Sequence, residues 1–357
     1  MSEPDPPADG VKIDESALEK STPTENGHQG ITNSSGWDGK LRMPPKATIT
    51  NPEALEDSDY SDPDAPPPEQ IETDEDLLDD YPDDTEDIDL VHFERLCLRQ
   101  NAINNVELPP SFGTHLQELD LYDNLISHIR GLDPLSALTS LDLSFNKIKH
   151  IKSISHLTTL KELYFVQNRI SKIENLDTLT NLTMIELAAN RIRDIENLDR
   201  LTSLRELWLG KNKITEINNL NSLTNLRLLD LKSNRLTTIS NLEPLVNLEE
   251  LYISHNALTT ISGLDHNIKL RVLDVSNNRI TRLEGLSHLT ELEELWASTN
   301  GLSSFKEVEE QLADKEKLET VYFEANPLQL QGPAVYRNKV RLALPQVRQI
   351  DATYVKV

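Results

Sequence analysis

Carboxylates and aromatic rings recur at a fixed interval along most of this sequence. Eleven asparagines from Asn101 to Asn326 mark the interval, and each of the eight gaps between Asn124 and Asn300 is 22 residues long. The residue four places before each asparagine belongs to what we call the central row: Cys97, Asp120, Asp142, Tyr164, Glu186, Trp208, Asp230, Tyr252, Asp274, Trp296 and Tyr322. Exposed rings supply binding energy at protein interfaces and carboxylates favour basic partners, so this row predicts recognition of another protein.

A second set of carboxylates accompanies the central row. Two positions before it, glutamates recur every 44 residues, at Glu118, Glu162, Glu206, Glu250 and Glu294. The central row itself alternates between acid and aromatic ring from Asp142 to Trp296, so two repeats form the unit of the pattern. Duplication of a 44-residue unit would copy such a pattern without any function. Exposed Trp and Tyr nevertheless lower solubility unless a partner covers them, which favours a binding surface.

The sequence offers no catalytic or metal-binding arrangement. Its nine histidines are scattered, and none stands with Cys, Asp or Glu at a metal-ligand spacing. No glycine-rich phosphate loop is present, and Cys97 has no activating neighbour in the sequence. Carboxylates repeated along a row usually serve recognition rather than acid–base chemistry. We therefore expect no enzyme activity, no cofactor and no metal.

The elements that must position the central row follow from the repeated phrase Leu-x-Leu-x-x-Asn-x-Ile/Leu. Leu141 and Leu143 would point to one side of a short strand, and Asn146 would pair turn backbone groups. Apolar residues then recur every third position from Ile148 to Leu160, which fits 3₁₀ or irregular turns. This period and phrase identify leucine-rich repeats. We predict an α/β repeat solenoid, a horseshoe with a parallel concave β-sheet and a thin convex side.

The charge distribution predicts the domain limits. Residues 1–90 hold 26 Asp/Glu against 5 Lys/Arg, and 12 of the 19 prolines. Few large apolar residues accompany this charge, so we predict a disordered acidic tail over 1–86. The repeats, about eleven, would span 87–328 with a short amino cap over 87–95.

The carboxyl-terminal cap is predicted over 329–357. Before it, Ser304 and Glu307 have the spacing of a helix capping box. Within it, Tyr336, Val340 and Leu344 would line one side of a helix that Pro345 ends.

Composition also limits location and partners. The start of the sequence has no basic flank or apolar stretch typical of a secretory signal, and no apolar run reaches the length of a membrane span. A single cysteine suits a reducing compartment. The net charge of −25 disfavours nucleic acid as a partner. We expect a soluble intracellular protein that binds neither nucleic acid nor membrane.

Several phrases of the sequence resemble those of a known family. The phrases LCLRQN, LYDN, KIENL, LGKNKI and SNRL, the stretch ETVYFEANPLQ and the cap YRNKVRLALPQVRQIDAT are similar to the leucine-rich-repeat regulatory subunit of protein phosphatase 1. The resemblance covers about 87–357. It implies a non-catalytic subunit that binds the phosphatase catalytic subunit and controls its activity, maturation or targeting. It also implies a nuclear as well as a cytoplasmic location, and leaves room for a third protein in a ternary complex.

The resemblance implies which residues contact the phosphatase. Carried over by position, they are Asp142, Tyr164, Glu186, Trp208, Asp274, Glu294, Trp296 and Tyr322. Weaker candidates come from the repeated pattern: Asp120, Glu162, Glu206, Asp230, Glu250 and Tyr252. All but Glu294 of the first group belong to the central row, which was defined without the resemblance.

Two departures and one alternative remain. The amino cap is shorter than is usual in that family. The chain also lacks the short docking motif of a basic residue, Val/Ile, any residue and Phe/Trp that many phosphatase partners use, so binding would need the folded surface. The alternative is a leucine-rich-repeat scaffold of another intracellular assembly, spliceosomal or cytoskeletal.

Overall fold

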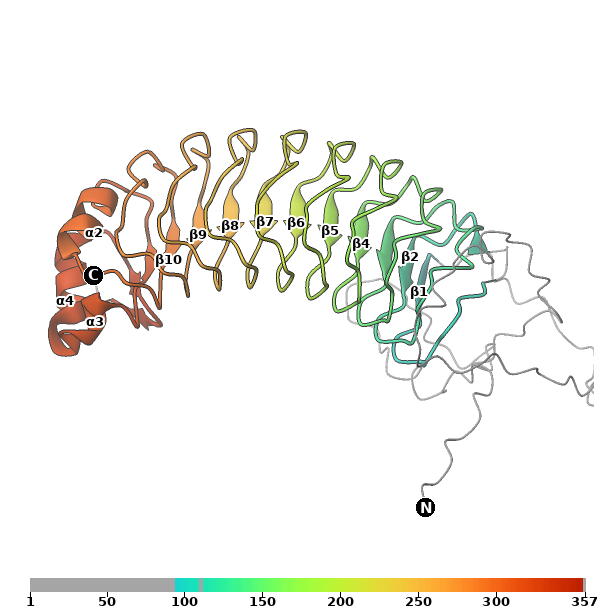
Figure 1. Cartoon of the computed structure of the whole chain (residues 1–357), viewed down its shortest axis with the longest axis horizontal. Helices are drawn as coiled ribbons and strands as arrows, with labels where there is room; N and C mark the ends of the chain where they lie inside the picture. The colour runs from blue at the N-terminus through green and yellow to red at the C-terminus, as the bar shows by residue number, and fades with distance from the viewer. Residues whose placement is uncertain (1–93, 109–111, 356–357) are drawn as a thin grey trace, which may run out of the picture.

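The computed structural model describes residues 94–108 and 112–355. The predicted tail over 1–86 and most of the predicted amino cap lie outside these residues. The described chain winds into successive turns that stack side by side along an arc, with the first repeats at one end and helices at the other (Figure 1). The solenoid predicted from the 22-residue period is confirmed.

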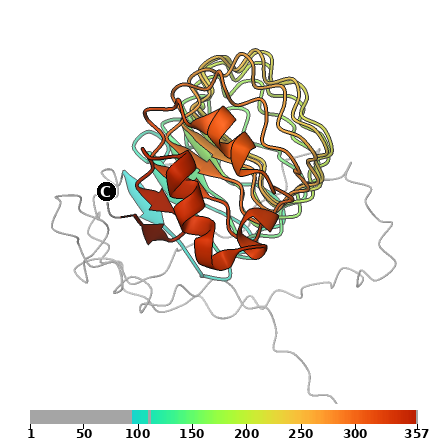
Figure 2. The same cartoon turned by 90° about the vertical axis from the view of Figure 1, so that its left-hand side faces the viewer.

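Each repeat contributes one three-residue strand to a single sheet. The repeat strands are β1 (Arg95–Cys97), β2 (Glu118–Asp120), β3 (Ser140–Asp142), β4 (Glu162–Tyr164), β5 (Met184–Glu186), β6 (Glu206–Trp208), β7 (Leu228–Asp230), β8 (Glu250–Tyr252), β9 (Val272–Asp274), β10 (Glu294–Trp296) and β11 (Thr320–Tyr322). Each pairs in parallel with the next, and β12 (Gln349–Ile350) and β13 (Thr353–Tyr354) extend the sheet, the last of them antiparallel. The strands line one side of the cross-section when the solenoid is viewed end on (Figure 2).

The apolar positions of the repeat build one continuous core. In the third repeat, Leu141 and Leu143 from the strand side are buried together with Ile148, Ile151, Ile154, Leu157 and Leu160 from the turns. The equivalent residues of neighbouring repeats stack on them in one cluster. A single repeat could not bury these side chains, so each turn depends on its neighbours for stability. The turn-to-turn contact also fixes the strand register, which places the functional side chains.

The asparagines satisfy the backbone of the turns, as the sequence predicts. The Asn146 side-chain amide donates to the Leu121 carbonyl (3.0 Å) and the Leu143 carbonyl (3.1 Å), while its oxygen accepts from the Ile126 N–H (2.9 Å). One buried side chain thus pairs groups of two adjacent repeats. The same pattern recurs along the array, for example at Asn212, and it joins the turns without helices. The convex side consists mainly of irregular turns.

The carboxyl end is covered by helices. They are α2 (Phe305–Leu312), α3 (Pro327–Leu330) and α4 (Pro333–Ala343), which lie over the last repeats (Figure 2). Tyr336, Val340 and Leu344 are buried as predicted, and α4 ends before Pro345. The capping box is only half formed. The Ser304 hydroxyl caps the Glu307 N–H (3.2 Å), but the Glu307 carboxylate turns to the Leu283 N–H (3.1 Å) of the previous repeat.

Candidate functional site

The strand register assembles the central row into one stripe. Asp120, Asp142, Tyr164, Glu186, Trp208 and Asp230 stand opposite one another on successive strands. Tyr252, Asp274, Trp296 and Tyr322 continue the series. In each of these strands the central leucine, isoleucine or valine is buried, so the first and last residues share the concave face. With strands about 4.8 Å apart, eleven strands give a stripe roughly 50 Å long.

The glutamates at the strand starts hold the aromatic rings of the same strands. The indole N–H of Trp208 donates to Glu206 (3.3 Å) and that of Trp296 donates to Glu294 (3.0 Å). The Tyr252 hydroxyl donates to Glu250 at 2.7 Å. Tyr164 and Glu162 repeat the arrangement at 3.3 Å. The 44-residue period therefore has a physical basis, because a ring and its acceptor occupy the two outward positions of one strand.

The intervening strands carry the complementary arrangement. Met184, Leu228 and Val272 occupy the strand starts where the strand ends are Glu186, Asp230 and Asp274. From β4 to β10, strands that carry a ring beside a glutamate thus alternate with strands that carry an acid beside an apolar side chain. A partner surface that fits this face must present apolar and basic groups in alternation.

Four aromatic side chains make a continuous chain over the carboxyl-terminal half of the face. Trp208 stacks with Tyr252 at 6.5 Å between ring centroids. Tyr252 meets Trp296 edge to face at 6.2 Å, and Trp296 meets Tyr322 at 5.7 Å. The first two contacts join rings two strands apart, so these rings lean over Asp230 and Asp274 on the strands between them, whereas Trp296 and Tyr322 lie on adjacent strands. Such an apolar ridge is suited to anchor a protein partner.

The acids beneath the ridge have a structural role. Asp230 is 5% exposed and Asp274 is 4% exposed. Their carboxylates accept the backbone N–H two residues on, from Lys232 (2.8 Å) and Ser276 (3.0 Å). Asp142 makes the same bond to Ser144 at 2.8 Å but remains partly exposed. Direct contact with a partner is therefore easier for Asp142 and Glu186 than for Asp230 and Asp274.

Three carboxylates of this face hold a proton more tightly than exposed carboxylates do. Burial raises the pKa of Asp142, Glu186 and Asp230 above the ordinary carboxyl values. The neighbouring charges of Asp142 and Asp230 add to the rise at Glu186. Burial, followed by the adjacent glutamates, also raises the pKa of the Tyr164 and Tyr252 hydroxyls, which remain neutral donors. The free face thus holds negative charge at an energetic cost that a basic partner would relieve.

Sequence reasoning missed a small cluster at the amino end of the face. Arg99 binds Asp120 (2.5 Å), approaches Asp142 (4.0 Å) and lies 5.0 Å from the centroid of the Tyr122 ring. Tyr122 in turn packs on Phe145 with 4.8 Å between centroids. Phe145 is 40% exposed and has a positive φ of 56° in the turn. An aromatic residue directly before a repeat asparagine was the signal that could have identified it.

All fourteen predicted contact residues lie on the solvent side of the sheet. The central-row members among them are Asp120, Asp142, Tyr164, Glu186, Trp208, Asp230, Tyr252, Asp274, Trp296 and Tyr322, and the strand-start members are Glu162, Glu206, Glu250 and Glu294. The structure brings the aromatic members from Trp208 to Tyr322 into ring contact. Tyr164 stands apart from them, with Glu186 on the strand between Tyr164 and Trp208.

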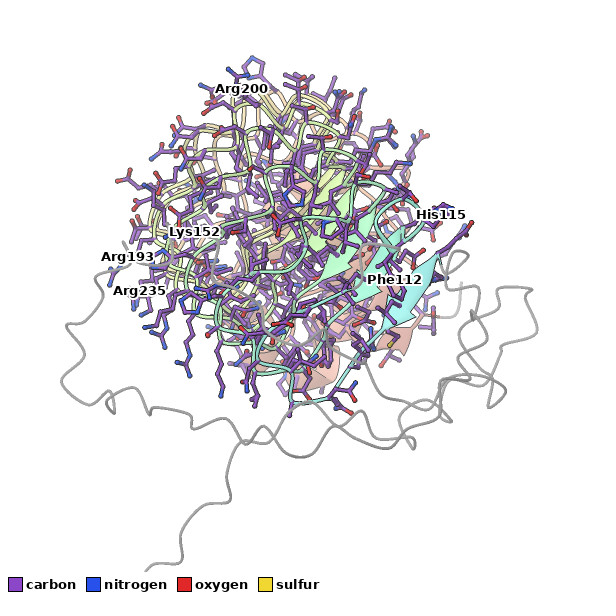
Figure 3. All side chains as sticks on the ribbon, turned by 90° about the vertical axis from the view of Figure 1, so that its right-hand side faces the viewer. Phe112, His115, Lys152, Arg193, Arg200 and Arg235 are labelled. Carbon is purple, nitrogen blue, oxygen red and sulfur yellow. The ribbon has the colours of Figure 1, made fainter. Side chains whose placement is uncertain are left out.

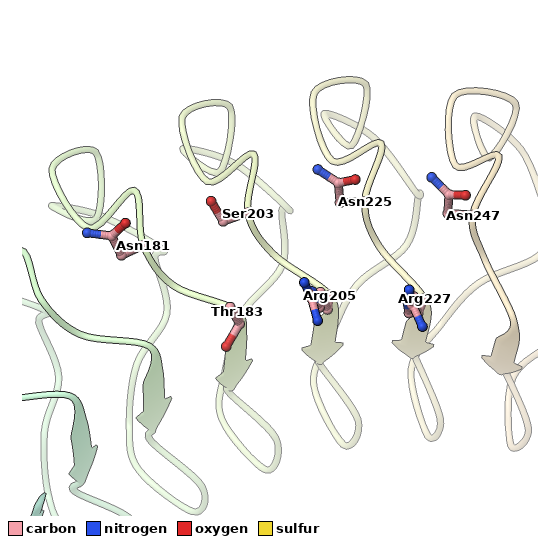
Figure 4. A pocket seen from close by; sticks show the side chains of 7 residues that line it. All are labelled: Asn181, Thr183, Ser203, Arg205, Asn225, Arg227 and Asn247. Carbon is pink, nitrogen blue, oxygen red and sulfur yellow. The ribbon is translucent and has the colours of Figure 1, made fainter.

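A shallow polar groove borders the concave face where the middle strands begin (Figure 4). It has a volume of about 540 Å³ and is lined by Asn181, Thr183, Ser203, Arg205, Asn225, Arg227 and Asn247. The amides of Asn181, Asn225 and Asn247 donate to carbonyls of the preceding repeat, so they belong to the scaffold. Arg227 pairs with Glu249 at 3.5 Å. The groove has hydrogen-bonding groups but no nucleophile beside a base.

The described residues show no arrangement for catalysis. Within residues 94–108 and 112–355, no three His, Cys, Asp or Glu side chains gather in a geometry that could hold a metal. Burial raises the pKa of the Cys97 thiol, which works against a reactive thiolate. Of the helices in this part of the chain, none is long and apolar enough to cross a membrane.

Sequence profiles of leucine-rich repeats match most of the array. The profile described as Leucine Rich repeats (2 copies) matches 158–200, 180–222, 202–244, 224–266 and 268–310. The profile described as Leucine rich repeat matches 91–148. These matches agree with the repeat phrase and with the observed stack of turns.

Several curated relatives share shorter stretches at higher identity. Protein phosphatase 1 regulatory subunit SDS22 of Schizosaccharomyces pombe is 69% identical over 52 residues, 15% of this chain and 16% of the relative. The protein of the same name from Saccharomyces cerevisiae is 48% identical over 110 residues, 25% of this chain and 32% of the relative. Protein phosphatase 1 regulatory subunit 7 of Mus musculus is 62% identical over 47 residues, 13% and 12% respectively. The matched stretches therefore span a third or less of these relatives.

Solved structures agree in fold. An internalin, InlF, from Listeria monocytogenes superposes with a TM-score of 0.59 at 26% identity, over 70% of this chain and 72% of that chain. The leucine-rich-repeat domain of APL1 gives a TM-score of 0.59 at 21% identity, over 75% and 70%. At these identities the agreement concerns the horseshoe and not the partner.

Proposed function

We propose that this chain, a leucine-rich-repeat protein with sequence homology to protein phosphatase 1 regulatory subunits, is a non-catalytic subunit of that phosphatase. Its concave face would bind the catalytic subunit and modulate its activity, maturation or targeting. The observation that carries the proposal is the ring chain from Trp208 to Tyr322 on the solvent side of the sheet.

The physical properties of the face support a folded partner with basic patches. The stripe is too long for a small ligand, and most of its polar groups are carboxylates. Its rings are held in place by glutamates, so little side-chain freedom would be lost on binding. The acids with raised pKa would gain stabilisation from an approaching lysine or arginine. These features fit a large, pre-formed interface better than a flexible peptide site.

The relatives support a regulatory role, since all three named above are protein phosphatase 1 regulatory subunits. Because the matched stretches are partial, the phosphatase as partner, the residues in contact and a third protein in the complex are proposals. So is a location in the nucleus and cytoplasm.

Binding of purified protein phosphatase 1 catalytic subunit to the full chain tests the proposal. The test compares wild type with the double variant Trp208→Ala/Trp296→Ala by calorimetry or biolayer interferometry. We expect the double variant to lose at least about 100-fold in affinity, since buried aromatic anchors dominate interface energy. Both tryptophans lie on the surface of the sheet, so the unfolding temperature should change little.

A control variant removes two exposed apolar side chains elsewhere on the surface. Ile268→Ala in a convex turn and Leu342→Ala on α4 remove side chains from residues that are 55% and 83% exposed. We expect this control to bind like wild type. Equal affinities for the double variant and the control would refute the assigned surface. Failure of wild type to bind, with capture of a different assembly from lysate, would favour a scaffold of another class.

A further inference from the structure

A ladder of cations runs along the side of the solenoid that the proposed function does not use. The residue after the repeat asparagine is basic in five consecutive repeats: Lys147, Arg169, Arg191, Lys213 and Arg235. Ala257 interrupts the series, and Arg279 resumes it in the following repeat. We call the five consecutive residues the basic ladder. A position that is cationic in every repeat of a long stretch forms a line of charge, because repeats stack in register.

The backbone fixes the ladder rigidly. The backbone N–H of each ladder residue donates to a carbonyl of the preceding repeat. Examples are Lys147 to Ile126 and Arg235 to Ile214, both at 2.8 Å. Four of the five residues are exposed, and Lys213 is half-buried. With turns about 5 Å apart, the five rungs extend over roughly 20 Å.

The ladder cations are unpaired within the described residues. None of the five side chains makes an ion pair or hydrogen bond with residues 94–108 or 112–355. This contrasts with the rim of the sheet, where Arg227 and Arg271 share Glu249 and Arg271 also binds Glu293. A line of cations without counter-charges is an electrostatic site for an extended polyanion.

The ladder lies away from the concave face. It follows the turn after each strand, and Arg235 of the ladder lies on the side away from the strands, as does Arg193, two residues after Arg191 (Figure 3). The two long surfaces therefore have opposite character, an acidic and aromatic face on the sheet and a basic line beyond the asparagine turn. An acidic segment would be repelled from the first and attracted to the second.

The chain itself contains such a segment. Residues 72–86 hold nine Asp/Glu and no Lys/Arg, and 1–90 as a whole hold 26 against 5. The segment is covalently attached next to the first strand, β1, and so would meet the ladder at an effective concentration in the millimolar range.

The distances permit the contact. The ladder begins at the turn after β3, about 10 Å along the solenoid from β1 at the usual strand spacing. The eight residues 87–94 could extend about 26 Å, and the fifteen residues 72–86 about 50 Å, more than the length of the ladder. We propose that residues 72–86 of the chain dock along the basic ladder, which leaves the concave face open for its protein partner. The inference holds whichever protein occupies that face.

Zero-length cross-linking of the full chain tests this proposal. A carbodiimide activates carboxylates and joins them as amides to lysine amines in direct contact, so Lys147 and Lys213 report on the ladder. Lys306 and Lys339, on the carboxyl-terminal cap, serve as reference amines. We expect cross-links from 72–86 to concentrate at Lys147 and Lys213, and to disappear at 1 M salt, where the screening length falls to about 3 Å.

A variant that leaves both reporter lysines intact sharpens the test. Arg169→Gln/Arg191→Gln/Arg235→Gln removes three ladder charges and should lower the cross-link yield at Lys147 and Lys213 roughly fivefold, the size expected of three exposed ion pairs. Arg130→Gln/Arg200→Gln/Arg341→Gln removes the same charge from exposed positions off the ladder and should leave the yield unchanged. Unfolding temperatures of both variants check that the fold is intact.

Mixing ¹⁵N-labelled and unlabelled chains separates contacts within one chain from contacts between chains. Cross-links confined to single isotopic species support the proposal. Mixed-isotope cross-links at the ladder would overturn it in favour of a second copy. Equal yields at Lys147, Lys213, Lys306 and Lys339, or a ladder variant that cross-links like wild type, would also overturn it.

Discussion

The two halves of the concave face are built from the same repeat but differ in how their side chains meet. In the carboxyl-terminal half, Trp208, Tyr252, Trp296 and Tyr322 touch ring to ring over buried acids. In the amino-terminal half, Asp142 and Glu186 flank Tyr164, and Arg99 forms an ion pair with Asp120. The carboxyl-terminal half therefore offers packed apolar area, and the amino-terminal half offers partly exposed negative charge.

We therefore expect the two halves to affect different steps of binding, dissociation and association. Packed rings lengthen the lifetime of a complex, because the rings must leave a pocket of the partner before the complex dissociates. Exposed carboxylates act at longer range and mainly raise the association rate with a basic partner. The account therefore predicts that variants in the two halves change different rate constants and respond differently to salt.

The largest effect is expected from the ring chain. Trp296→Ala should weaken phosphatase binding by about 2 kcal/mol, chiefly through faster dissociation, because Trp296 contacts both Tyr252 and Tyr322. Tyr164→Ala should cost about half as much, since burial of a single ring contributes less. Surface plasmon resonance gives both rate constants. Equal losses for the two variants would remove the distinction between the halves.

Charge removal in the amino-terminal half should have a smaller and salt-dependent effect. Asp142→Asn/Glu186→Gln should lower affinity by about 1 kcal/mol at low salt, mainly through the association rate. The difference from wild type should shrink at 0.5 M salt, whereas the effect of Trp296→Ala should persist. Association rates measured over a salt series provide the test. A salt-independent loss would indicate that these carboxylates make desolvated contacts instead.

The pH dependence of binding should be weaker still. Because burial raises the pKa of Asp142, Glu186 and Asp230, these groups take up protons at higher pH than exposed carboxyls. A basic partner binds the ionised forms, so affinity should fall about threefold between pH 7.5 and 5.5. Calorimetric titration at several pH values measures this slope. Asp142→Asn/Glu186→Gln should flatten it, and an unchanged slope would assign the effect to the partner.

The same pKa shifts predict a small gain in stability of the free chain. The folded state binds protons at these carboxyls more tightly than the unfolded state does, so their contribution to the free energy of unfolding increases as pH falls toward the ordinary carboxyl pKa. At neutral pH, Glu186→Gln removes the unfavourable charge and should raise the free energy of unfolding by about 0.5 kcal/mol. Chemical denaturation shows the gain. A control variant at an exposed glutamate outside the concave face, Glu309→Gln on α2, should show none.

Much of this arrangement was predictable because the repeat period fixes the register. The equal spacing from Asn124 to Asn300 predicts the strand positions, and therefore also that Trp208 and Trp296 share one face of the sheet. The buried leucines followed from the same phrase. The weaker points were those where the sequence leaves the period, as at Ser304 and Glu307, whose capping box is half formed because Glu307 binds the neighbouring turn.

Side-chain direction across strands could not be predicted in the same way. The burial of Asp230 and Asp274 depends on rings from both neighbouring strands leaning over them, which no spacing reveals. The contact between Tyr122 and Phe145 depends on the left-handed backbone at Phe145. The sequence shows the 44-residue period of the glutamates, but only the structure shows that these glutamates accept hydrogen bonds from the rings.

Fluorine NMR of the chain labelled with 5-fluorotryptophan tests the central claim most directly. The chain has three tryptophans, of which Trp208 and Trp296 lie on the concave face and Trp37 lies in the acidic segment before the repeats. On addition of unlabelled phosphatase catalytic subunit, the resonances of Trp208 and Trp296 should shift and broaden while that of Trp37 stays in place. A complex that forms with both concave-face resonances unchanged would contradict the account.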